Sequence, residues 1–146
     1  MIWRVLLLVV AVCYCTICLG AETVNPQAIE GVWSCVEAFN NGSQLPAEKA
    51  SQLRLTLTDK QFKTQLGEQV LFDSTYKLDV TKSPAHIEML GNEGDLKGKP
   101  ALGVIQLESG VLKLCYVMPG GERPKAFESL PGSMATLTVW KKAETK

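Results

Sequence analysis

The sequence contains a single histidine, His86, and only two cysteines beyond residue 21, Cys35 and Cys115. Zinc sites need several closely spaced histidine and cysteine ligands, so this scarcity excludes the usual zinc patterns. A catalytic serine or cysteine needs a base beside it, and no motif pairs His86 with either. Gly120-Gly121 lacks the following helix that a phosphate-binding loop requires. We therefore expect a protein that is not an enzyme and has no metal or cofactor.

The sequence also lacks an excess of charge of either sign. It has 15 basic and 15 acidic side chains, scattered along the chain rather than grouped. Proteins that bind nucleic acid or an anionic membrane surface usually carry a basic patch. The charge balance therefore argues against both of these partners.

Long apolar runs are absent except at the N-terminus, where MIWR is followed by VLLLVVAVCYCTICLG. One arginine, about 15 apolar residues and the small pair Gly20-Ala21 are typical of a secretory signal peptide. The run is shorter than the roughly 20 residues that span a bilayer. We predict a signal peptide at 1–21 and a periplasmic or extracellular domain at 22–146. An uncleaved anchor is the alternative, and would be the chain's only contact with a membrane.

Helical patterns are nearly absent from residues 22–146, apart from one or two turns expected in PAEKASQ (46–52). Turn-forming residues recur every eight to twelve residues, a spacing typical of all-β sandwiches and barrels. Apolar and polar side chains alternate between these turns, as they do on strands with one face in solvent. We predict one domain, an eight-stranded antiparallel barrel, because closure removes exposed strand edges. The predicted strands are 31–39, 53–59, 61–66, 68–79, 86–90, 101–109, 111–118 and 134–142.

Several blocks of sequence resemble a known family. GVW (31–33) is similar to the G-x-W signature of lipocalin-like (calycin-like) barrels. The wider series resembles a family of small exported lipocalin-like domains of unknown function that is abundant in planctomycete bacteria. Its blocks here are IEGVW (29–33), NNGSQLP (40–46), LRLT (53–56), YKLDVTKSP (76–84), IEM (87–89), KGK (97–99), LGVIQLESGVLKLCYVMPGGERPKAF (102–127) and PGS (131–133).

The resemblance implies an exported, single-domain, eight-stranded lipocalin-like barrel. It implies no catalytic or ligand-binding residue, because none is established for the family. Cys35 stands where the family shows no consistent cysteine, so a disulfide from it would not be a family feature. Two interpretations of the cysteines remain open. Cys35 and Cys115 form a disulfide in an oxidising compartment, or they are two small apolar side chains.

The aromatic residues are candidates either for a filled barrel or for the lining of a ligand cavity. On the strand at 68–79, Val70, Phe72, Ser74, Tyr76 and Leu78 share one predicted face, with Leu71 on the other. Barrels of this size are often filled by their own side chains. The tentative ligand-binding residues are Trp33, Phe72, Tyr76, Tyr116 and Arg123.

Arg123 has a second possible role at one end of the barrel. Barrels of this type often place a cation over the G-x-W tryptophan, and Arg123, Lys141 or Lys142 would each serve over Trp33. Both roles stay open at the level of sequence.

Two functions therefore compete. The first is a non-catalytic exported module that binds a small apolar ligand inside the barrel. The second is a cell-envelope interaction protein with a filled core, whose partner would contact the loops at 91–100 and 120–133. An internal void of roughly 300 Å³ or more would favour the first.

Overall fold

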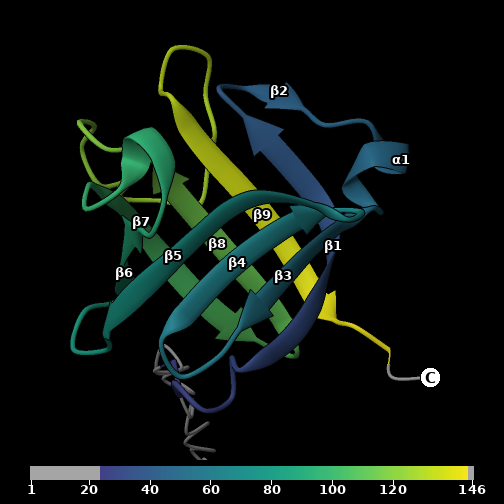
Figure 1. The fold of residues 1–146 in the computed structure, drawn as a ribbon, viewed down its shortest axis with the longest axis horizontal. Helices are drawn as coiled ribbons and strands as arrows, with labels where there is room; N and C mark the ends of the chain where they lie inside the picture. The colour runs from purple at the N-terminus through teal and green to yellow at the C-terminus, as the bar shows by residue number, and fades with distance from the viewer. Residues whose placement is uncertain (1–23, 145–146) are drawn as a thin grey trace, which may run out of the picture.

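The computed structural model describes residues 24–144, and the predicted signal peptide lies outside these residues. The strands follow one another around a closed antiparallel barrel in which β1 pairs with both β3 and β9 (Figure 1). This confirms the predicted all-β, eight-stranded barrel. Its strands are β1 (Gly31–Asn40), β3 (Leu53–Leu57), β4 (Gln61–Leu66), β5 (Gln69–Asp79), β6 (Ala85–Gly91), β7 (Pro100–Glu108), β8 (Val111–Val117) and β9 (Ala135–Lys142).

The turns have the backbone conformations that their residues favour. Ser109-Gly110 joins β7 to β8 with φ angles of 51° and 76°, as a two-residue hairpin turn requires. Asn41-Gly42 turns in the same way and leads into β2 (Ser43–Gln44), a two-residue strand that was not among the predicted strands. The helix α1 (Ala47–Ala50) lies within the segment predicted to hold one or two helical turns. A short 3-10 helix, η1 (Gly94–Leu96), lies within the predicted loop.

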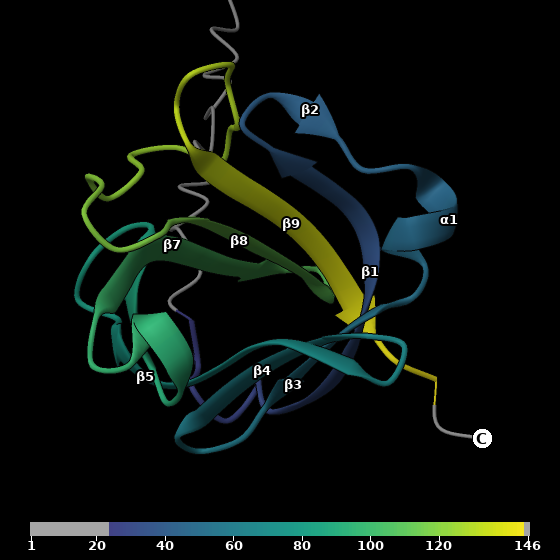
Figure 2. The ribbon, with the colours of Figure 1, turned by 45° about the horizontal axis from the view of Figure 1, so that its top comes forward.

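The two ends of the barrel differ, and we define them by their loops. The closed end holds the β7–β8 turn and the start of β1. The open end holds the end of β1, the start of β9 and the segment that carries β2 and α1. Figure 2 shows β2 and α1 beside β1, outside the ring of strands. At this end the long 118–134 segment is tied to the β1–β2 turn, because the Gly42 amide donates to Ser129 Oγ over 2.9 Å.

Large apolar side chains fill the closed half of the barrel. Leu55, Leu57 and Ile87 point inward from their strands and are at most 1% exposed. Leu53, Leu55 and Leu57 alternate with more exposed neighbours along β3, as the sequence predicted. At roughly 25 cal/mol per Å² of apolar surface removed from water, each such side chain contributes about 2 kcal/mol.

Two bulges change which side chains point inward near the open end. In β1, Cys35 pairs with Trp140 and Glu37 with Val139, so Val36 is an extra residue and Ala38 becomes buried. A bulge adds one residue to one strand and shifts the alternation beyond it. The register here therefore differs from the one that simple alternation from Trp33 predicts.

The second bulge lies between β4 and β5. Thr64 pairs with Phe72 and Gln65 with Val70, so Leu71 has no partner in the register. The predicted common face of β5 therefore extends only from Phe72 to Leu78. The prediction was wrong for Val70, which is 46% exposed.

Candidate functional site

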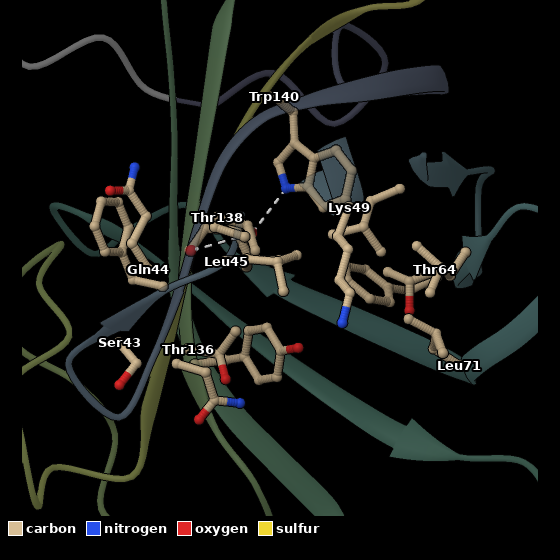
Figure 3. Close-up of a pocket in the computed structure, with 17 residues that line it drawn as sticks. Ser43, Gln44, Leu45, Lys49, Thr64, Leu71, Thr136, Thr138 and Trp140 are labelled. Carbon is tan, nitrogen blue, oxygen red and sulfur yellow. Dashed lines mark hydrogen bonds between the residues drawn. The ribbon is translucent and has the colours of Figure 1, made fainter. Parts of the chain in front are cut away.

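The open half of the barrel contains a cavity of about 400 Å³. Its walls come from β1, β3, β4, β5, β8 and β9, and the β2–α1 segment forms part of its rim (Figure 3). Seventeen residues line it: Ala38, Phe39, Asn40, Ser43, Gln44, Leu45, Lys49, Leu53, Phe62, Thr64, Leu66, Leu71, Leu114, Tyr116, Thr136, Thr138 and Trp140. The volume exceeds the threshold set above for a ligand site.

The cavity exists because small side chains occupy inward positions near the open end. Ala38, Thr64, Thr136 and Thr138 line it at positions where the closed half has leucine, isoleucine or tryptophan. Protein interiors are otherwise packed as densely as organic crystals. A row of small residues therefore leaves space that only a ligand or water can occupy.

The inner part of the cavity is apolar and well ordered by its own contacts. Trp140 is 1% exposed, and its indole N–H donates to Thr138 Oγ1 over 2.8 Å. Phe62 meets Phe72 edge to face with ring centroids 6.2 Å apart, an arrangement that aromatic pairs prefer. With the Trp140 donor already satisfied, this region offers a ligand apolar surface rather than hydrogen bonds.

A phenol and a threonine supply polar groups to the wall. Burial raises the pKa of the Tyr116 hydroxyl, and a hydrogen bond with the Thr136 side chain opposes that rise. Tyr116 therefore stays neutral at physiological pH, where its hydroxyl can donate or accept a hydrogen bond. These groups can orient a ligand, but they add no charge.

The rim carries one charged side chain. Among the described residues that line the cavity, Lys49 alone is charged. Figure 3 shows its amine turned toward the space between Leu45 and Leu71. The β2–α1 segment, which carries Lys49, is held against the barrel by two contacts. The Leu45 amide donates to the Ala38 carbonyl over 2.8 Å, and Ala50 is buried.

The structure brings only one of the five predicted ligand residues into the cavity. Tyr116 lines it, and Phe72 packs behind Phe62, one residue of its wall. Tyr76 belongs to the closed half, where its hydroxyl donates to the Thr58 carbonyl over 2.7 Å. Trp33 is also buried there, with 1% of its surface exposed.

Trp33 seals the closed end together with a cation. Its indole N–H donates to the Ile29 carbonyl over 2.8 Å, and Lys142 Nζ lies 4.5 Å from the ring centroid. Lys142 also donates to the Glu30 carbonyl. Of the three cations considered for this position, the structure selects Lys142.

Arg123 lies elsewhere on the barrel wall. One of its guanidinium nitrogens, NH1, donates to the Ile87 carbonyl over 2.8 Å and to the Gly103 carbonyl over 2.6 Å. Arg123 is also close to His86. The pKa of His86 is lowered mainly by burial and, to a smaller extent, by the positive charge of Arg123. Because β6 and β7 do not line the cavity, Arg123 anchors the 118–134 segment to the wall rather than contacting the cavity.

The two cysteines are free and lie in different hydrophobic clusters. Cys35 belongs to the interior core. Cys115 packs with Val104, Val117 and Ala135 in a cluster between the barrel wall and the 118–134 segment. The thiols donate to separate carbonyls, those of Glu37 and Glu128. They are not bonded to each other in this fold, which favours the interpretation as small apolar side chains.

We expect Cys35 to resist alkylation in the native protein and to react freely after unfolding. Burial raises its pKa from 9.0 to about 11. Since the thiolate is the reactive form, its fraction at pH 8 falls roughly a hundredfold. The alkylation rate should rise about tenfold per pH unit until the pH approaches 11. Iodoacetamide treatment without reductant, followed by peptide mapping, measures this. A linked Cys35–Cys115 peptide would contradict the structure.

Most residues of the cavity could not be predicted from the sequence. Lys49, Leu71, Thr136 and Thr138 have no motif around them, and their role depends on the bulges and on barrel closure. One signal was available. Threonines recur two residues apart at 136 and 138 on the last predicted strand, where larger apolar residues would fill a barrel.

A scan against protein-family models, a search of curated proteins and a search of solved structures each found no match. Within residues 24–144, no group of three or more metal-ligating side chains gathers. No helix in that part of the chain has the length and hydropathy to cross a bilayer.

Proposed function

We propose that this protein is an exported, non-catalytic module of the lipocalin-like type that binds a small apolar ligand in the open half of its barrel. The cavity of about 400 Å³ is the observation that carries this function. Ligand sites are concave, mostly apolar and supplied with a few polar groups. Leu53, Phe62, Leu114 and Trp140 provide the apolar wall, and Tyr116 provides a neutral hydroxyl.

The sealed closed end supports the same function. Trp33 and Lys142 shut one end of the barrel, so a ligand would enter and leave at the other, beside the β2–α1 segment. The competing role, an envelope protein with a filled core, needs an interior without such a space. Export rests on the N-terminal sequence, and the family on the G-x-W and loop blocks.

Binding of 1-decanol tests the function directly. A ligand that binds only the folded state stabilises it by RT ln(1 + [L]/Kd), about 1.4 kcal/mol at ten times Kd. We expect a saturable rise of several degrees in Tm and one decanol per chain by calorimetry. 1-Butanol, with little apolar surface to bury, serves as the control. A Tm that does not respond to decanol would contradict binding of a neutral apolar ligand.

A further inference from the structure

The charge distribution around the cavity points to the head group of the ligand. The 17 lining residues include one ammonium, that of Lys49, and no carboxylate. Their remaining polar groups are hydroxyls, amides and backbone atoms, all neutral. A ligand that fills this cavity therefore meets a single positive charge at the rim with no protein anion in the lining to balance it.

The fold holds that lysine close to the rim. The amides of Lys49 and Ala50 both donate to the Pro46 carbonyl over 2.9 Å, which forms the turn of α1. Ala50 is 2% exposed and packs with the core, so the turn has one orientation. Lys49 is itself exposed, and Figure 3 shows its amine turned toward the cavity.

A neutral apolar ligand leaves this ammonium without a partner. Because Lys49 is exposed, its amine stays hydrated beside a neutral head group and gains no ionic contact from it. A carboxylate at the same place accepts a charge-assisted hydrogen bond from the amine, the stronger kind of hydrogen bond. The site should therefore prefer an anion over a neutral ligand of equal length.

The volume limits the length of the apolar part. At about 30 Å³ for each group the size of a water molecule, a cavity of 400 Å³ holds roughly 13 non-hydrogen atoms. Decanoate has 12 and 1-decanol has 11. A chain of about ten carbons fills the apolar part while its head remains at the rim.

We propose that the natural ligand is an anionic amphiphile, an apolar chain of about ten carbons ending in a carboxylate that Lys49 binds at the mouth of the cavity. This assignment rests on the proposed function and narrows it to a ligand class. Thr136 and Tyr116 line the wall and leave charge recognition to the lysine.

Calorimetric titration of decanoate and 1-decanol at pH 7.5 tests the assignment. A carboxyl group is ionised at that pH, since its pKa is near 4. We expect the wild-type chain to bind decanoate about tenfold more tightly than decanol, the effect of one charge-assisted contact. Added salt should weaken decanoate binding and leave decanol binding unchanged, because salt screens charges at a rim.

The variant Lys49→Gln removes the charge and keeps a good helix former in α1. Its affinity for decanoate should fall about tenfold, to the level of decanol, while decanol binding stays within twofold of wild type. Lys49→Arg should restore the preference for decanoate. Lys113→Gln is the matched control, because Lys113 is an exposed lysine on β8 that does not line the cavity.

The outcomes separate this assignment from the function on which it rests. Equal binding of decanoate and decanol by the wild-type chain would overturn the assignment and leave ligand binding intact. An equal loss of both ligands in Lys49→Gln would also overturn it, because the lysine would then have only a structural role. If neither ligand binds the wild-type chain, the proposed function fails, and the assignment with it.

Discussion

Replacing Trp33 with alanine is expected to lower the free energy of unfolding by about 4 kcal/mol, the cost of removing a buried tryptophan. The side chain is 1% exposed and fills the closed end. The change also removes the indole donor to the Ile29 carbonyl and the ring beneath Lys142. Since domains are stable by only about 5–15 kcal/mol, the variant would lose much of its stability. Urea unfolding followed by circular dichroism measures this.

Smaller substitutions at the closed end separate the interactions that contribute to the expected loss of stability in Trp33→Ala. Trp33→Phe keeps a ring but loses the indole N–H, and a loss of about 1–2 kcal/mol is expected. Lys142→Met removes the cation over the ring and the hydrogen bond to the Glu30 carbonyl, and a loss of about 1–2 kcal/mol is expected. Lys141→Met is its control, because that lysine is exposed and has no ring beside it. A Trp33→Ala variant that lost under 1 kcal/mol would show that the closed end does not depend on this residue.

Filling the cavity is expected to abolish ligand binding without unfolding the protein. Thr64→Phe places four additional non-hydrogen atoms in the space, about 120 Å³ at roughly 30 Å³ each. That is a substantial part of the 400 Å³ available. We expect the Kd for 1-decanol to rise at least tenfold by calorimetry. The free energy of unfolding should change by less than about 1 kcal/mol, because filling a cavity adds apolar contacts.

Thr75→Phe is the matched control for that experiment. Thr75 is exposed on β5 and lies between the buried Ser74 and Tyr76, so its side chain points away from the interior. The same substitution there adds the same atoms outside the barrel and should leave decanol binding unchanged. Unchanged binding in Thr64→Phe would mean that decanol binds somewhere other than this cavity.

The strands were predictable because strand periodicity is local. The alternation Leu53, Leu55, Leu57 and the turn residues Ser109-Gly110 each act over a few neighbours, so their effect on the backbone can be read without knowledge of the fold. Each of the eight predicted strands has a counterpart in the structure within one or two residues of its bounds. The bulges escaped prediction because an extra residue such as Val36 or Leu71 is defined only by the register with the neighbouring strand.

The candidate residues were predicted less well than the fold. Tyr116 was placed correctly as a possible lining residue, while Trp33 and Tyr76 proved to be packed into the closed half. Sequence cannot separate these cases, because every inward-facing aromatic residue has the same local pattern. Arg123 binds two carbonyls on strands far from it in sequence, a contact that local pattern cannot indicate.

The sequence by itself determined the fold class and the approximate bounds of the eight barrel strands. These properties depend on composition and on interactions between near neighbours. Only the tertiary structure decided that the barrel is hollow at one end, that Lys49 carries the one charge in the lining, and that Cys35 and Cys115 are apart. A cavity is the difference between the space that a closed barrel encloses and the volume of its inward side chains. That difference acquires a value only when strand register has set which side chains point inward.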